Sequence, residues 1–276
     1  MIVEESAKNY TMTFHGVDDL VEYTRDKVLA SGYRRDFYGV SSGRQALKLA
    51  HDGVPIVDAM AGVDVSALSS VRDMLSIRYD VSGGQVDVGR YLTGEPECMW
   101  DFVDESNRTN RVITIVSNLT SPSRVSTAAF ERRGRQVVAL INAIDQAGFQ
   151  VELWTEAIAS EKPEKSSFGM GSDDPGRTVG CKVRVKTAGQ AFDPQQVMFT
   201  MSHPAWYRVF NFKAWDTVPE PWYSALSMGY GKGFGRTDVR GDWDEDTIYL
   251  PVLMSDNDPD VIGPALEKLG LLAEAK

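Results

Sequence analysis

The sequence predicts an α/β protein built around a mixed sheet, and three observations support this fold class. Residues 112–116 form a short, almost wholly apolar run, which is typical of a strand buried on both faces. Residues 126–147 place apolar side chains at helical spacing, and residues 150–155 return to a strand pattern. Such a β-α-β unit predicts two parallel strands joined by a right-handed crossover.

The elements before this unit are mainly helical. Residues 10–14 predict a short strand because they are β-branched and aromatic, and residues 17–29 carry apolar side chains at helical spacing. The pattern then predicts helices at 44–50 and 55–75, a hairpin of 76–81 with 85–88, and a structured loop at 90–97. The polar stretch 101–111 is the predicted boundary between an additional N-terminal α+β portion, residues 1–105, and an α/β domain, residues 106–276.

After the unit, residues 161–177 are rich in Lys, Ser, Gly, Asp and Pro and predict a long mobile loop. Residues 181–186 alternate strictly, which favours an edge strand paired with residues 151–155. The remaining predicted elements are helices starting at Asp193-Pro194 and His203-Pro204, a strand at 247–253 and a terminal helix from Asp258-Pro259 through Leu272.

From Arg111 the predicted order is β, α, β, β, α, α, β, α, and over residues 111–276 it resembles the von Willebrand factor A domain. The resemblance implies a three-layer α/β domain with a mixed sheet. That family holds a divalent cation with an Asp-x-Ser-x-Ser motif just after its first strand, whereas residues 118–123 here are Asn-Leu-Thr-Ser-Pro-Ser. Because the leading carboxylate is missing, we expect no metal there, and nothing else in the sequence requires a cofactor.

A second resemblance rests on three motifs: Tyr79-Asp80-Val81-Ser82-Gly83, the stretch 86–99 with Arg90-Tyr91-Leu92-Thr93-Gly94-Glu95-Pro96-Glu97, and Arg132-Arg133-Gly134. They resemble a family of uncharacterised proteins encoded by tailed phages and mobile elements. The resemblance implies a protein made in the bacterial cytoplasm that acts in phage transcription, replication or host takeover. It implies no catalytic activity for particular residues.

The composition limits the function classes. The 276 residues are 42% hydrophobic and 25% charged, which is typical of a folded protein. A formal charge of −10 argues against general nucleic-acid binding through overall positive charge, although it is compatible with a local basic face. Two cysteines, Cys98 and Cys181, are too few for a disulfide framework, and no apolar run is long enough to span a membrane. We therefore expect a cytoplasmic protein that does not engage a membrane.

The sharpest functional pattern is Gly229-Tyr230-Gly231-Lys232-Gly233-Phe234-Gly235-Arg236. Glycines allow close approach of the backbone, Tyr230 and Phe234 can stack on unpaired bases, and Lys232 and Arg236 can meet phosphates. The alternative interpretation is a flexible connection whose aromatic side chains fold back on the core.

Two basic clusters extend this hypothesis. They are Arg132, Arg133 and Arg135 near the start of the predicted long helix, and Lys182, Arg184 and Lys186 on the predicted edge strand. If both share a face with the glycine-rich loop, they form an electropositive groove for single-stranded nucleic acid. The alternative is that each cluster is a solvated face, with the lysines of the strand protecting an exposed sheet edge.

Other side chains suggest weaker alternatives. Asp242, Asp244 and Asp246 can bind a cation or act as acid and base, or they simply form a solvated turn. The three histidines lie in separate elements, and no nucleophile motif occurs, so nucleophilic catalysis lacks support. Among the aromatic residues at 206–223, Trp215 and Trp222 are candidate anchors for a protein partner, with the core as the alternative location.

These patterns, together with the phage context that the second resemblance implies, predict a phage-encoded, non-catalytic accessory protein in nucleic-acid transactions. It would bind single-stranded DNA, recruit a polymerase, or do both, as a transcription or replication factor. One alternative is an adaptor that binds only protein, such as an inhibitor of a host enzyme. The other is a metal-dependent hydrolase that uses the three aspartates between residues 242 and 246.

Overall fold

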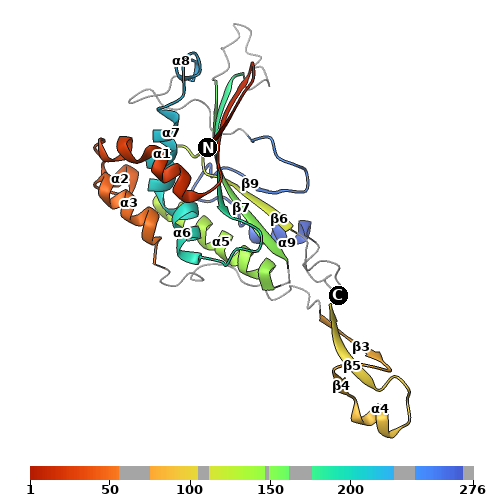
Figure 1. Cartoon of the computed structure of the whole chain (residues 1–276). Coiled ribbons are helices and arrows are strands. Elements are labelled where there is room, and N and C mark those ends of the chain that lie inside the picture. The colour runs from red at the N-terminus through yellow and green to blue at the C-terminus, as the bar shows by residue number, and fades with distance from the viewer. Residues whose placement is uncertain (56–74, 105–111, 147–148, 162–175, 227–239, 270–276) are drawn as a thin grey trace.

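The computed structural model describes residues 1–55, 75–104, 112–146, 149–161, 176–226 and 240–269 (Figure 1). Within these ranges the chain has a mixed α/β fold, with a six-stranded mixed sheet and a second sheet of three strands. No helix in the described ranges is both long enough and apolar enough to cross a membrane.

The six-stranded sheet contains both parallel and antiparallel pairs. Its strands, in spatial order, are β1 (Ile2–Glu5), β2 (Asn9–Phe14), β8 (Thr178–Lys186), β7 (Gln150–Ser160), β6 (Val112–Asn118) and β9 (Ile248–Leu250). β6 and β7 are parallel, as predicted, and β9 runs parallel to β6 on its other side. β8 pairs with β7, as predicted, and this pair is antiparallel, as is the pair of β1 and β2.

The prediction that residues 181–186 form an edge strand is wrong. β2 pairs with β8 in parallel register from Asn9 opposite Thr178 to Phe14 opposite Val183, so β8 lies inside the sheet. The N-terminal strands therefore belong to the same sheet as strands that follow residue 106. The predicted boundary between residues 105 and 106 lies outside the described residues.

Several of the helices begin at a capping side chain. Asp193 caps α6 by accepting hydrogen bonds from the amides of Gln195 and Gln196 at 3.0 and 3.1 Å, as predicted for an Asp-Pro start. Ser126 Oγ accepts from the Ala129 amide at the start of α5. The helical segments are α1 (Val17–Leu29), α2 (Arg35–Tyr38), α3 (Gly43–Asp52), α4 (Val88–Leu92), α5 (Thr127–Gln146), α6 (Pro194–Ser202), the π-helical η2 (Trp206–Asn211), α7 (Phe212–Trp215), α8 (Trp222–Ala225) and α9 (Ile262–Lys268).

The apolar strand residues that pack against the helices come from one face of the large sheet. On β2 and β8 they include Phe14 and Val183, which pack with α1 and η2. On β6 and β7 they include Ile115 and Leu153, which pack with α5, α6 and α9. A helical layer on the second face is not seen in the described part of the chain, so the three-layer von Willebrand A-like arrangement is not confirmed.

The smaller sheet corrects two further predictions. It contains β3 (Leu75–Asp80), β5 (Met99–Asp104) and β4 (Gln85–Val86) in that spatial order, so β3 and β4 do not form the predicted hairpin. Gly83 passes over β5, where an added Cβ would lie 2.9 Å from the Trp100 carbonyl oxygen. The short helix α4 (Val88–Leu92) begins two residues after β4 and includes residues 90–92 of the predicted loop.

The C-terminal elements follow the predicted order with different limits. The helix predicted from Asp258 begins at Ile262, because the Asp258 carboxylate instead accepts from the Met254 amide and from Ser255 Oγ and closes a turn. The predicted helix at 55–75 and most of the predicted loop at 161–177 lie outside the described residues.

Candidate functional site

The second face of the large sheet carries polar and aromatic side chains, and we call it the polar face. Lys182 of β8 is in register with Glu156 of β7, and Glu156 is in register with Asn118 at the carboxyl end of β6. Glu4 of β1 pairs with Thr11 of β2 on the same face. Because strand side chains alternate between faces, these residues all lie opposite the apolar face that the helices cover.

Glu156 is the centre of a buried hydrogen-bond network on this face. Its side chain is 1% exposed, and its carboxylate accepts from Tyr249 Oη at 2.7 Å, Trp243 Nε1 at 2.9 Å and the Gly241 amide at 3.1 Å. The packing is close, because a Cβ at Gly241 would overlap the carboxylate. Burial, together with the Glu156 charge, raises the pKa of Tyr249. The network therefore fixes the segment 240–249 to β7.

The network continues to the carboxyl end of β6. Asn118 Nδ2 donates to Tyr249 Oη at 2.8 Å, and Asn118 Oδ1 accepts from the Thr120 amide at 2.9 Å. β7 and β9 lie on opposite sides of β6 and run parallel to it. In open α/β sheets, ligands commonly bind outside the carboxyl ends of the parallel strands. The position of the network thus favours a functional role for this part of the polar face.

Two tryptophans lie beside the network, each with a cation over its ring. Trp154 of β7 and Trp243 have ring centroids 5.7 Å apart, and both are half-buried. Lys182 Nζ lies 4.3 Å from the Trp243 ring, and the Arg184 guanidinium lies 5.7 Å from the Trp154 ring. Aromatic rings and cations therefore alternate across neighbouring positions of the polar face.

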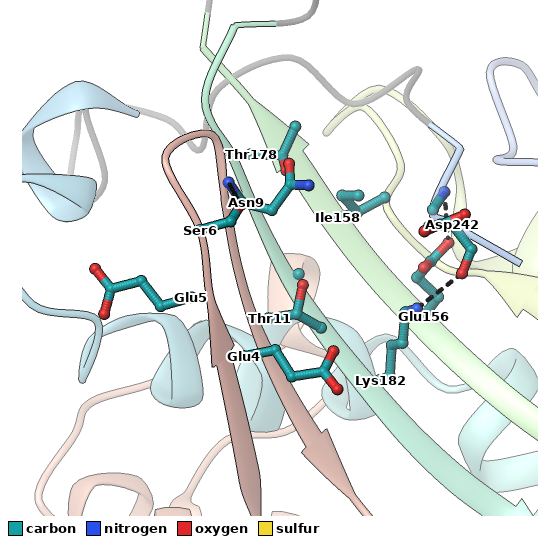
Figure 2. A pocket seen from close by; sticks show the side chains of 12 residues that line it. Glu4, Glu5, Ser6, Asn9, Thr11, Glu156, Ile158, Thr178, Lys182 and Asp242 are labelled. Carbon is teal, nitrogen blue, oxygen red and sulfur yellow. Dashed lines mark hydrogen bonds between the residues drawn. The ribbon is translucent and has the colours of Figure 1, made fainter.

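A hollow of about 270 Å³ adjoins these residues. Figure 2 shows Glu4 and Lys182 on its β1–β8 side and Glu156 and Asp242 beyond Lys182, whereas Glu5 points away from this group. Lys182 Nζ donates to the Asp242 carbonyl at 3.0 Å. Among the charged groups of the lining, carboxylates outnumber the single ammonium.

A family model described as a domain of unknown function (DUF7192) matches residues 2–273. The chain belongs to the DUF7192 family. No curated protein and no solved structure matches this DUF7192 chain. The description of the DUF7192 family assigns no activity, so the role of the site is inferred from its geometry.

The structure separates the two predicted basic clusters of the DUF7192 chain. Lys182 and Arg184 lie on the polar face, whereas Lys186 is buried and donates to the Val151 carbonyl at 3.0 Å. Arg133 is buried on α5, where Nη1 donates to the Pro251 carbonyl at 3.0 Å. Burial lowers the pKa of Arg133 to about 10. The prediction that Lys186 and Arg133 meet phosphates is therefore corrected, because neither is accessible.

The remaining basic and aromatic candidates also have defined positions. Arg132 donates to the Asp256 carbonyl on the helical side of the molecule. Trp215 and Trp222 are buried in the core, and Trp222 Nε1 donates to Glu5 at 2.9 Å, so the prediction that they anchor a partner is wrong. Tyr230, Lys232, Phe234 and Arg236 of the glycine-rich loop lie outside the described residues.

The acidic candidates do not assemble into a metal centre. In the ranges that the structure covers, no group of three or more His, Cys, Asp or Glu side chains is placed to hold a metal ion, and this includes Asp242, Asp244 and Asp246. All three aspartates are exposed. In this segment the backbone carbonyl of Asp244 accepts a hydrogen bond from the Thr247 amide and closes a turn.

Sequence reasoning missed the residues at the centre of the site. A signal was present at Glu152, Trp154 and Glu156, which alternate with apolar residues along β7 and so share one face. A charged and aromatic stripe of this kind predicts a strand with one face turned away from the core. Trp243 and Tyr249 carried no such signal, because only the fold brings their segment across β7.

Proposed function

We propose that this DUF7192 protein is a non-catalytic accessory factor that binds single-stranded nucleic acid on the polar face of its large sheet. One observation carries the proposal: Trp154 and Trp243 lie side by side on that face, with Lys182 and Arg184 over their rings. Sheet faces with half-exposed aromatic rings and neighbouring cations are suited to stack unpaired bases and to contact the phosphates between them.

The two cations are placed to do both tasks. A base that stacks on Trp243 takes the position of the Lys182 ammonium over that ring, and the ammonium is then free to pair with a phosphate. The same exchange applies to Arg184 and Trp154. The formal charge of −10 opposes binding, but exposed charges more than about 8 Å away are largely screened at physiological ionic strength. The distant carboxylates therefore oppose binding only weakly.

We also propose the von Willebrand A-like arrangement and the phage context that the sequence led us to expect. In the former, Asn118 takes the place of the first metal ligand, and its side chain is engaged with Tyr249 and Thr120. We propose that this position has a structural role and holds no cation. A cytoplasmic location is proposed on the same footing.

The proposal is tested with a labelled, unstructured single-stranded oligonucleotide titrated across a salt series, with duplex as the comparison. Base stacking contributes about 1–3 kcal/mol per base, so Trp154→Leu should weaken binding by about fivefold to 150-fold, and Trp154→Phe should retain most of the affinity. Lys182→Gln with Arg184→Gln should lower the slope of log K against log salt by about 0.7 for each lost contact.

Arg44→Gln is the matched control, because Arg44 is an exposed cation on α3, far from the polar face in the fold. It should leave both affinity and salt slope unchanged. Absence of single-strand binding by the wild-type chain at low salt would refute the proposal. So would equal loss of affinity in Arg44→Gln and in the polar-face variants.

A further inference from the structure

The short helix α4 presents an apolar face to solvent. Val88, Tyr91 and Leu92 are 63, 65 and 77% exposed, the last being the most exposed large apolar side chain in the described residues. Their spacing of three and four residues places them on one side of the helix. Val81 and Val86, in the same small sheet region, are also exposed. Figure 1 shows α4 at the end of the small sheet that lies away from the large sheet.

This orientation is the reverse of an ordinary amphipathic helix. The Arg90 guanidinium lies 3.8 Å from the centre of the Tyr79 ring on β3, and Arg90 Nη1 donates to the Glu97 carbonyl at 3.2 Å. Since Arg90 projects from the opposite side of α4 to Tyr91 and Leu92, the polar side packs on the sheet. Folding alone would favour the reverse arrangement, because exposed apolar area lowers stability.

Several hydrogen bonds hold α4 in this orientation. Asp87 Oδ1 accepts from the Arg90 amide at 3.1 Å, and Asp87 Oδ2 accepts from Tyr79 Oη at 3.2 Å. Thr93 Oγ1 donates to the Arg90 carbonyl at 2.9 Å. These bonds set the orientation of α4 on the small sheet, and an apolar face that is preformed in this way costs less entropy to dock.

The charge around this face selects the kind of partner. Residues 75–104 contain six carboxylates and only two arginines, so this region carries four net negative charges. We propose that the outer face of α4 docks against an apolar helix face of a protein partner that is flanked by Lys and Arg. The acidic side chains of this region then meet the basic flanks.

A second copy of this chain fits the face less well. Two such regions would bring like charges together, which opposes a symmetric contact. The face consists of three side chains on a five-residue helix, whereas a stable interface buries roughly 800 Å² on each partner. Because this area requirement applies to any partner, the charge of the region decides between the two, and it favours a different, basic protein.

The test uses two fluorescein-labelled amphipathic helical peptides as probes, one of leucine and lysine and one of leucine and glutamate, titrated with the full chain. The leucine–lysine peptide should bind at least tenfold more tightly than the leucine–glutamate peptide. Tyr91→Ser with Leu92→Ser should weaken its binding at least tenfold. Leu29→Ser is the matched control, because Leu29 is an apolar side chain of α1 that is 48% exposed, and it should change nothing.

Three results of the binding assay would overturn the inference. These are equal binding of the two peptides, equal loss of affinity in Leu29→Ser and in the α4 variant, and no binding of either peptide. Sedimentation of the wild-type chain as a dimer that Leu92→Ser dissociates would also overturn it, by assigning the face to a second copy. Circular dichroism of each variant shows whether the fold is retained, and Leu92→Thr replaces any variant that unfolds.

Discussion

Replacement of Glu156 by glutamine tests whether the buried network holds the polar face together. The carboxylate accepts three hydrogen bonds, with Trp243 Nε1 on one oxygen and with the Gly241 amide and Tyr249 Oη on the other. Glutamine keeps the size and shape of the side chain, but its amide nitrogen cannot accept a hydrogen bond. At least one of the donors must therefore face another donor.

The magnitude follows from which donors can adapt. If the glutamine nitrogen replaces the oxygen that binds Trp243, it faces the indole N–H. If it replaces the other oxygen, it faces the Gly241 amide, while the Tyr249 hydroxyl can rotate to accept. Either orientation leaves one buried donor unpaired, at a cost of about 1–3 kcal/mol, and removing the charge weakens the remaining bonds. Neutralising a buried carboxylate offsets part of this loss. We expect Glu156→Gln to lower the free energy of unfolding by about 2 kcal/mol and the Tm by roughly 4–8 °C.

Urea unfolding followed by tryptophan fluorescence measures this difference directly, with exposed Glu131→Gln as the control. Glu156→Gln combined with Tyr249→Phe should show a coupling of 0.5 kcal/mol or more, on the order expected for groups in one network. Because the network positions Trp243, single-strand affinity should fall together with stability. A Glu156→Gln protein as stable as the wild type, or more stable, would show that the desolvation cost exceeds the value of the bonds and would refute this account of the site.

Three further predictions concern the core. One thiol, Cys98, should react with a thiol reagent in the native protein and two in denaturant, because Cys181 is buried and burial raises the pKa of its thiol; two reactive native thiols would contradict this packing. Burial lowers the pKa of His203 in the folded protein. Below about pH 6.5 the unfolded chain binds a proton there more readily than the folded chain, so urea midpoints should fall as the pH drops below that value. His203→Asn should reduce the slope of the urea midpoint against pH. In thermal melts, Gly134→Ala should destabilise the protein by about 1–3 kcal/mol, because the added Cβ would overlap a serine side chain of α6. This loss is expected although alanine has a better helix propensity than glycine. At Gly263 an added Cβ faces open space, so Gly263→Ala should be neutral or stabilising.

Local patterns predicted the elements that depend on local chemistry. The β6-α5-β7 unit and the Asp193 cap of α6 are found where hydrophobic spacing and capping residues place them. The position of β8 within the sheet could not be predicted the same way. Its alternation is compatible with an edge, and only the long-range pairing with β2, more than 160 residues away in sequence, places it inside.

The same limit applies to the site and to α4. Glu156 lies just beyond the predicted strand 150–155, and its three donors come from residues 241–249, which no local pattern links to β7. Arg133 and Lys186 looked solvated because charged residues usually are, yet the fold buries both and gives each a backbone carbonyl. In α4 the apolar positions gave no warning of exposure, since spacing defines a face of a helix but not its direction.

The polar face and the outer face of α4 should act independently, and a cross-test decides this. The two faces belong to different sheets, and the closest element contacts of β3, β4 and β5 in the described residues are with one another. Energetic effects of substitutions at separate sites with no shared partners usually add. We therefore expect Leu92→Ser to leave single-strand affinity within about twofold of the wild type, and Trp154→Leu to leave binding of the leucine–lysine peptide equally unaffected. If each substitution abolished both activities while the Tm stayed unchanged, one shared surface would bind both probes, and the assignment of separate roles to the two faces would fail.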